Sequence, residues 1–321
     1  MKYRFLIDFL WQWFGAPKSP LSTYLTRSLL FLTLFLCGLN AGAQTQTYVF
    51  ATYTYSTNTR LKHLEPLTQY LSAKTGHSFV VRSYPTVQAL IQGIAQDSVD
   101  FAMINTLGYL TLQHKHPELA KPVLTLDLGD ATITHYGGCI IARKDAPFTS
   151  LKDLINATDR LSLGLVNSSS TSGNLVPRLL LNQEGFEHAD SSFRVSYRGT
   201  HKTVVEDVLA GKIQLGGCGC AEVDSARKYL AFDQKATVLG AFHDIPLGPV
   251  IHHREVPKQV VRDVVRALNR IHEDNFTILE QFSGGWTEFR EARRFKKVRD
   301  RDYNSFRRLF GKNKFLWQMI E

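Results

Sequence analysis

From Thr47 onward, short apolar runs alternate along the chain with segments whose apolar residues recur at helical spacing. Short apolar runs bounded by turn residues are typical of buried strands, and a spacing of three or four residues is typical of helices that pack on a core. The predicted strands are 48–52, 79–81, 101–104, 139–143, 161–166, 193–197 and 213–216. The predicted helices are 61–75, 87–95, 174–183, 204–210, 257–273, 274–282 and 303–320. The regular alternation of the two patterns predicts an α/β fold with doubly wound, mostly parallel sheets.

The pattern restarts after the run 139–143, so that a second series of strands and helices mirrors the first. Two such series are typical of a protein with two lobes, each built on its own sheet. The strands near Ile140 and Val250 stand where the chain would cross between the lobes. We therefore expect two crossover hinge strands, a first lobe of residues 44–140 plus 248–321, and a second lobe of residues 141–247.

The N-terminal region has the pattern of an export signal. Arg27 precedes an apolar run, 29–39, which is followed by the small residues 41–43. This order is typical of a cleaved signal peptide, and the run is only about half as long as a membrane-spanning helix. We expect residues 1–43 to be removed and the mature protein to be periplasmic. The long segment before Arg27 leaves the true start of the leader open.

Charge gives a weaker signal than hydrophobic pattern. The chain has a formal net charge of +9 at pH 7, and loss of residues 1–43 would leave it net basic. Basic residues cluster in the segment 290–299, but acidic residues are interleaved with them, which favours a solvated surface over a nucleic-acid site. A mildly basic protein suits an anionic small molecule, and we expect no nucleic-acid partner.

Three cysteines follow the predicted leader: Cys139, Cys218 and Cys220. Exported proteins meet oxidants, so one disulfide with one free thiol is the simplest arrangement, and three buried free thiols are the alternative. Two thiols separated by one residue lack the paired spacing of a zinc site. We expect no metal and no cofactor.

The clearest chemical signal is the hydroxyl-rich loop 167–172, which lies between the predicted strand 161–166 and the predicted helix 174–183. A loop of this kind presents hydroxyl groups and the unpaired backbone N–H groups of a helix start to one point, where the helix dipole favours negative charge. These features predict an oxyanion site. The competing interpretation is that Ser170 or Ser172 simply caps the helix.

The run 170–178, STSGNLVPR, resembles the STSG-x-LVPR signature of the phosphonate-, phosphite- and phosphate-binding proteins of ABC importers, the PhnD-like group of type II periplasmic binding proteins. The runs 197–204, YRGTHKTV, and 209–216, LAGKIQLG, resemble two further motifs of that family. The resemblance implies a monomeric protein that captures such an oxyanion between two lobes and delivers it to a membrane permease. It also implies that the protein is not an enzyme.

The resemblance assigns ligand contacts to the second lobe. It implies that Ser170, Thr171 and Ser172 donate hydrogen bonds to the oxygens of the anion and that His201 contacts the anion from the next loop. A histidine beside an anion is expected to favour its protonated form.

The first lobe is expected to supply tyrosines. The run 105–109, NTLGY, resembles the family's GP-x-SY loop, which implies that Tyr109 closes over the ligand, with Asn105 and Thr106 as possible further contacts. Tyr55 resembles the family's other ligand-facing tyrosine, and Tyr53 is the alternative. Tyr55 and Tyr109 could also be packing residues, since tyrosines near strand ends are often half-buried.

The chain departs from the family pattern at two places. The segment 216–222 offers no carboxylate at its strand end, where aminoalkylphosphonate binders carry acidic groups, although Glu222 or Asp224 could substitute one turn later. Asn105 and Thr106 replace the usual small residue and proline. Sensor domains that bind sulfur oxyanions depart in a similar way, so a receptor for a thiosulfate-like or tetrathionate-like ligand that reports to a membrane sensor or redox system is the alternative function.

Two other function classes are compatible with the sequence. Cys218 or Cys220, both also possible ligand contacts, could serve as a nucleophile with His201 as its base, although no acidic residue that would orient this histidine is evident. A structural or adhesive role is the third possibility, in which no small anion would bind.

Overall fold

The computed structural model describes residues 46–129, 136–157 and 159–320. The expected signal peptide, residues 1–43, therefore lies outside the described residues. Residues 47–321 group into one compact unit. Within the described part of the chain, no helix combines the length and the apolar character needed to cross a membrane.

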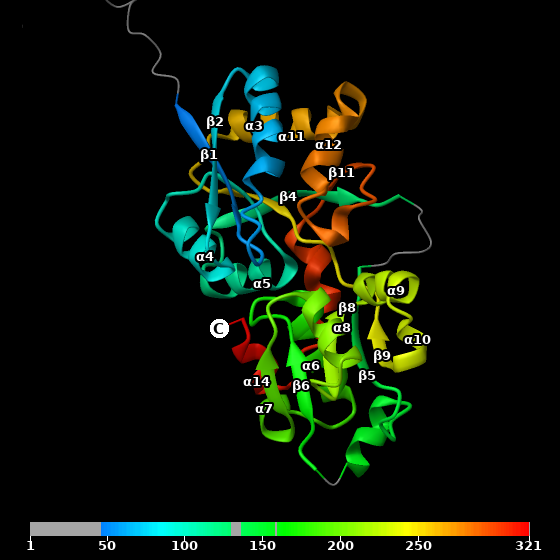
Figure 1. The fold of residues 1–321 in the computed structure, drawn as a ribbon. Helices are drawn as coiled ribbons and strands as arrows, with labels where there is room; N and C mark the ends of the chain where they lie inside the picture. Colours follow the sequence, from blue (N-terminus) through cyan, green and yellow to red (C-terminus); the bar gives the residue numbers. More distant parts are fainter. Residues whose placement is uncertain (1–45, 130–135, 158, 321) are drawn as a thin grey trace, which may run out of the picture. The chain divides into compact units, whose positions relative to one another are not determined.

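A six-stranded sheet takes its strands from both segments of the predicted first lobe, residues 44–140 and 248–321 (Figure 1). In spatial order its strands are β11 (Arg294–Lys297), β4 (Ala120–Asp127), β10 (Val250–His253), β3 (Phe101–Met103), β1 (Thr47–Tyr53) and β2 (Ser78–Tyr84). β1 pairs in parallel with β2 and β3, whereas β10 runs antiparallel to its neighbours β3 and β4.

A five-stranded sheet forms the second lobe. In spatial order its strands are β7 (Arg194–Tyr197), β6 (Ser162–Leu165), β8 (Leu215–Gly219), β5 (Gly138–Arg143) and β9 (Ala236–Phe242). β6 pairs in parallel with β7 and β8, and β5 runs antiparallel to β8 and β9. Both sheets thus share one arrangement. Three neighbouring strands are parallel, the first of them along the chain (β1 or β6) lies between the other two, and a reversed strand (β10 or β5) lies beside this group.

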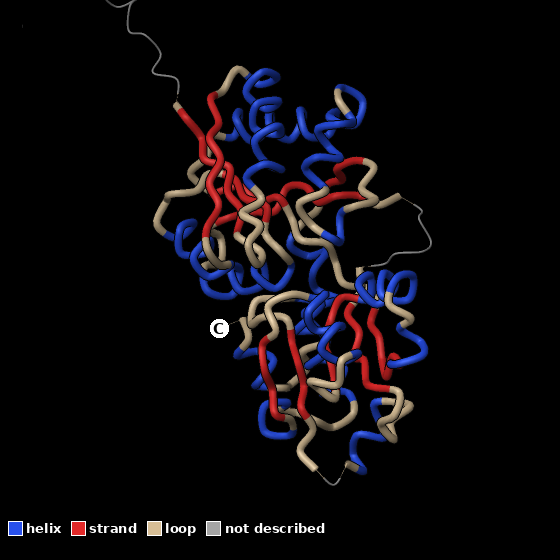
Figure 2. Tube along the Cα trace, viewed as in Figure 1, coloured by secondary structure: helices blue, strands red, loops and turns tan. Residues whose placement is uncertain are grey.

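Helices cover both faces of each sheet, as Figure 2 shows. On the six-stranded sheet, the apolar side chains of α3, α11 and α12 pack on one face with Phe50, and those of α4 and α5 pack on the other with Ala51. Alternate residues of β1 thus point to opposite layers, as the pleat requires. These helices are α3 (Leu61–Thr75), α4 (Val87–Ala95), α5 (Thr106–Lys115), α11 (Lys258–Asp274) and α12 (Phe276–Ser283).

The five-stranded sheet is covered in the same way. α8 and α9 pack on the face of Ile141, and α6 packs on the face of Ile140. The helices in this part of the chain are α6 (Val176–Gln183), α7 (Ala189–Ser192), α8 (His201–Leu209), α9 (Cys220–Tyr229) and α10 (Phe232–Lys235). The prediction of doubly wound α/β sheets therefore describes both lobes, and four strands of each sheet run in one direction.

The C-terminal segment differs from its prediction. Instead of one helix over 303–320 in the first lobe, the chain forms α13 (Asn304–Arg308) and α14 (Lys314–Gln318), separated by Gly311 at a φ of 55°. The Asn313 side chain donates to Asn182 and to the carbonyl of Glu187, both in the second lobe. The aromatic and aliphatic residues of these helices share a core with α6.

The first crossover also lies differently from its expected position. β5 belongs wholly to the five-stranded sheet, so the second lobe begins before residue 141. Cys139 in β5 forms a disulfide with Cys220 at the start of α9, and Cys218 is a buried free thiol. The arrangement of one disulfide and one free thiol is the simpler of the two that the cysteine count allowed.

Candidate ligand-binding site

A cavity of about 340 Å³ lies where loops of both sheets meet. Its walls follow the carboxyl ends of β1, β2 and β3 in one sheet and of β6 and β7 in the other. Ligands of open α/β sheets bind at such strand ends, beside the point where the strand order reverses. Most of its lining side chains are polar, and hydroxyl groups dominate: Thr54, Ser56, Thr86, Ser168, Ser169, Ser170, Thr171, Ser172 and Thr287.

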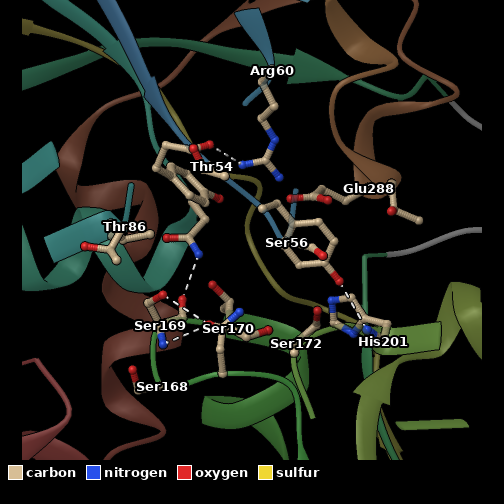
Figure 3. A pocket seen from close by; sticks show the side chains of 18 of the residues that line it. Thr54, Ser56, Arg60, Thr86, Ser168, Ser169, Ser170, Ser172, His201 and Glu288 are labelled. Atoms are coloured by element: carbon tan, nitrogen blue, oxygen red, sulfur yellow. Dashed lines mark hydrogen bonds between the residues drawn. The ribbon is translucent and has the colours of Figure 1, made fainter. Parts of the chain in front are cut away.

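The predicted hydroxyl loop forms one wall of this cavity (Figure 3). Ser170 is the N-cap, and its Oγ accepts a hydrogen bond of 3.0 Å from the N–H of Gly173. The residues Thr171–Leu175 then form a π-helical turn that leads into α6. The N–H groups of Thr171 and Ser172 begin this turn, so they have no acceptor within it. Ser170 is thus a capping residue, as the competing interpretation expected, while the backbone N–H groups of Thr171 and Ser172 can still donate to a ligand.

Contacts across the cavity join the two sheets. The N–H of Leu107 donates to Thr171 Oγ1 at 3.0 Å, and Asn105 Nδ2 donates to the carbonyl of Ser169 at 2.8 Å. Asn105 also caps α5 through the N–H of Gly108. Thr171 therefore has a structural role in addition to any role with a ligand, and Asn105 holds the first lobe against the hydroxyl loop.

His201 lies at the first position of α8, where its ring faces the cavity. Its Nδ1 accepts a hydrogen bond of 2.8 Å from the N–H of Gly219, so the ring is neutral and Nε2 carries the proton. Burial lowers the pKa of His201 from 6.5 to about 4. The expectation of a protonated His201 is therefore wrong, because a backbone donor occupies the nitrogen that would bind the second proton.

Tyr55 lies over His201, with ring centroids 6.0 Å apart. Its hydroxyl accepts a hydrogen bond of 3.1 Å from the backbone N–H of His201, and burial raises its pKa to about 12. The phenol therefore keeps its own proton as a donor at neutral pH. Tyr55 and its alternative Tyr53 both line the cavity.

Arg60 is a cavity residue that the sequence analysis missed. It is only 4% exposed, its Nε donates to the carbonyl of Gly285, and its Nη1 donates to the carbonyl of Tyr53. Its guanidinium lies over the rings of three aromatic residues: Tyr53, Tyr55 and Trp286. Among the described residues, no carboxylate forms an ion pair with Arg60, so a nearly buried cation has only neutral acceptors.

Glu288 is the second residue that the sequence did not reveal. It lines the same cavity, and Figure 3 shows its side chain extending toward Arg60. Burial raises the pKa of its carboxyl group, while its own backbone N–H and the positive charge of Arg60 oppose the rise. The two charged groups interact electrostatically without ion-pair contact.

A second cavity of about 240 Å³ adjoins the first and shares part of its wall, including Ser172, His201 and Glu288. Its far side carries charged residues of both signs: Glu222, Asp224, Lys228, Arg290 and Glu291. Glu222, one of the two acidic residues considered as substitutes for the missing strand-end carboxylate, therefore faces this adjoining space and not the first cavity.

Four of the proposed contact residues lie away from the first cavity. Tyr109 is fully buried, and its hydroxyl donates to Asp300 at 2.7 Å, so it does not close over a ligand. Thr106 is also buried and donates to the carbonyl of Pro246. Cys218 and Cys220 lie in the core cluster beside α8. The α5 helix turns the side chains of residues 106 and 109 toward the core and leaves only its N-cap residue, Asn105, at the cavity.

The cysteine chemistry considered above is not supported either. Cys220 is held in the disulfide, and Cys218 is fully buried, which raises the pKa of its thiol. A nucleophilic cysteine needs an accessible thiol with a lowered pKa. In the described part of the chain, no group of three or more His, Cys, Asp or Glu residues is arranged to hold a metal ion.

Two α/β sheets of the same strand order, with a hydroxyl-rich cavity at the carboxyl ends of their parallel strands, are the architecture of a two-lobed solute-binding protein. The family model for the periplasmic substrate-binding protein of phosphonate ABC transporters matches residues 50–303, and the chain belongs to this family. The resemblance inferred from the hydroxyl loop is therefore confirmed. No curated protein sequence matches the chain.

Solved structures confirm the fold class. XAC2383 from Xanthomonas citri, bound to chloride ion, is 18% identical with a TM-score of 0.67, and the match covers 85% of this chain and 98% of that chain. PhnD1 from Prochlorococcus marinus, in complex with methylphosphonate, is 14% identical with a TM-score of 0.66, and the match covers 84% and 98%.

A third structure is a binding protein component of an ABC phosphonate transporter from Pseudomonas aeruginosa. It is 16% identical with a TM-score of 0.64, and the match covers 86% of this chain and 88% of that chain. At these identities the similarity establishes the type II periplasmic binding protein fold.

Proposed function

We propose that this protein captures a small oxyanion of the phosphonate, phosphite or phosphate type in the 340 Å³ cavity and delivers it to the permease of an ABC importer. Its location would be extracytoplasmic, after removal of the predicted leader. The family to which the chain belongs supports the transport role, and the chemistry of the cavity supports the class of ligand.

Arg60 is the observation that carries the proposal. A guanidinium that is almost fully removed from water loses much of its hydration. Its hydrogen-bond acceptors are neutral carbonyls, and the carboxyl group of Glu288 in the same cavity forms no ion pair with it. An anion bound in the cavity would supply the negative charge of such a pair. The surrounding hydroxyl groups and the Nε2–H of His201 would then donate to the remaining oxygens of the anion.

The mechanism follows from contacts that already cross the cavity. Hydrogen bonds from Leu107 to Thr171 and from His201 to Tyr55 link the two sheets at the cavity wall. An anion that accepts donors from both sides would add to these links and favour the closed arrangement of the lobes. Affinity is then set by how many bonds the oxyanion regains after it loses its water.

A thermal-shift screen tests the proposal. The purified protein is melted with phosphate, phosphite, methylphosphonate, sulfate, thiosulfate and tetrathionate. A ligand present at a hundredfold excess over its Kd stabilises a protein by about 2.7 kcal/mol. We expect the largest shift from a phosphorus oxyanion, and a protein that responds to none of these anions would contradict the proposal.

Matched variants locate the site. Arg60→Gln should abolish the shift, whereas Lys62→Gln, which removes the same charge from an exposed position of α3, should leave it unchanged. Arg60→Lys keeps the positive charge but cannot donate to the carbonyls of Gly285 and Tyr53 in the way the guanidinium does, so we expect a reduced thermal shift. A normal response from Arg60→Gln would exclude this cavity as the site.

A further inference from the structure

Among the described residues that line the first cavity, Glu288 is the only acidic one, and it has few partners of its own. In the described structure its carboxyl group accepts from its own backbone N–H, and no other side chain donates to it. The charged or titratable groups around it in the first cavity are Arg60, Tyr53, Tyr55, Tyr136 and His201. On the side of the adjoining cavity they are Glu222, Asp224, Lys228, Arg290 and Glu291. An ionised carboxylate, which can only accept hydrogen bonds, therefore projects into a space lined mostly by hydroxyl, amide and guanidinium groups that can donate.

This acceptor has a chemical consequence for any anion bound beside Arg60. A carboxylate accepts hydrogen bonds but cannot donate them, and it repels a second anion at close range. The repulsion becomes an attraction only when one proton lies between the two groups, in a charge-assisted O–H···O⁻ bond. The monoanions of phosphonates, phosphite and phosphate keep one P–OH group, which can supply this proton. Sulfonates and sulfate are fully ionised at neutral pH and have no such group.

We propose that Glu288 is a specificity-determining residue that selects oxyanions bearing an acidic O–H group, so that phosphonates are preferred over sulfonates of the same shape. The inference rests on the proposed function, because it concerns the same cavity. It assigns the choice between the two ligand classes to one carboxyl group, while Arg60 and the hydroxyl loop supply attraction for either class.

Methylphosphonate and methanesulfonate are a suitable pair of probes because they have the same shape. Titration calorimetry is carried out at several pH values below the second pKa of methylphosphonate, so that each ligand carries a single negative charge, and the two affinities are compared at the highest of these values, where Glu288 is most ionised. We expect the wild-type protein to bind methylphosphonate at least about tenfold more tightly, since the sulfonate leaves a buried acceptor facing an anion. Glu288→Gln, whose amide can donate, should bring the two affinities to within about threefold.

Glu222→Gln is the matched control, because this partly buried glutamate lines only the adjoining cavity. It should keep the preference of the wild-type protein. Equal binding of both probes by the wild type, a preference that survives in Glu288→Gln, or a preference lost equally in Glu222→Gln would each overturn the inference. If neither probe nor any other oxyanion binds the wild type, the proposed function itself fails.

The wild-type protein provides a second measurement that does not depend on any variant folding. A sulfonate can be accepted only when Glu288 is protonated, so its affinity should fall by up to about tenfold for each pH unit above the pKa of Glu288. The affinity for methylphosphonate should not follow this fall until the ligand loses its own proton. The low pKa of His201 keeps that ring neutral over the range from pH 5 to 8. A sulfonate affinity that does not change with pH would overturn the inference.

Discussion

The backbone N–H of Gly219 donates to Nδ1 of His201 at 2.8 Å, which connects the end of β8 to the first residue of α8. This bond fixes the tautomer of the ring and directs its only N–H, at Nε2, away from the backbone. The histidine therefore serves the cavity as a neutral donor, and its protonation would break a hydrogen bond of the fold.

The first prediction concerns stability at low pH. The pKa of His201 is about 4 in the folded protein and 6.5 in its ordinary state, so the unfolded chain binds more protons between these values. The contribution of this group is fully present above pH 6.5 and is lost as the pH falls toward 4. Unfolding by urea at several pH values should show wild type losing up to about 3 kcal/mol more than His201→Asn over this range. His114→Asn, at an exposed position, should behave like the wild type.

The second prediction separates two serines of the hydroxyl loop. Ser170→Ala removes the N-cap bond to Gly173, so it should lower the free energy of unfolding by about 1 kcal/mol. Ser172→Ala removes a hydroxyl that faces both cavities and should weaken oxyanion binding with a smaller loss of stability. Denaturant unfolding and titration calorimetry on both variants check this division. A Ser172→Ala protein with unchanged affinity would contradict it.

A third prediction concerns Tyr109, for which the family resemblance and the structure give opposite expectations. Tyr109→Phe removes a partly buried hydrogen bond to the carboxylate of Asp300, so stability should fall by about 1.5 kcal/mol. Affinity for the oxyanion should stay within about twofold of the wild type, because the ring packs on Tyr303 and not in the cavity. Loss of binding with unchanged stability would restore the role that the resemblance implied.

The disulfide supplies a fourth prediction. The bond between Cys139 and Cys220 closes a loop with a sequence separation of 81 residues. In the chain-entropy account, a cross-link over a loop of this length stabilises the folded state by about 4 kcal/mol. Reduction by dithiothreitol should therefore lower the Tm markedly.

Two cysteine variants separate the disulfide from the free thiol. Cys139→Ala with Cys220→Ala should melt at the lowered temperature and should not respond to the reductant. Cys218→Ala removes only the buried free thiol and should keep the full response. A Cys218→Ala protein that no longer responds to reduction would show that the pairing is different.

The sequence was sufficient to predict the hydroxyl loop because its members are consecutive. One strand, one turn and one helix start place them together, and the pattern of each element can be read locally. The alternation of strands and helices predicted both sheets for the same reason. It failed for β4, β9 and β11. β9 and β11 are edge strands and β4 lies next to β11, and in all three exposed or half-exposed positions interrupt the apolar run that would mark a buried strand.

Arg60 and Glu288 could not be predicted in this way. Arg60 stands just before α3 in a left-handed conformation, and Glu288 lies in a short turn after α12. Only the fold brings these distant positions to one cavity. The family motif was misleading for Tyr109, because likeness of sequence in the run 105–109 does not determine which way a helix turns its side chains.

The final helices, α13 and α14, complete the apolar core on one face of the five-stranded sheet. Phe306, Phe310 and Leu316 are buried in the core cluster that also contains Ile140 of β5 and the apolar residues of α6. A chain shortened at residue 303 would expose this apolar surface to water, which favours self-association. Proteolysis or an early stop codon near the C-terminus would therefore impair solubility first, even though every residue that lines the first cavity would still be present.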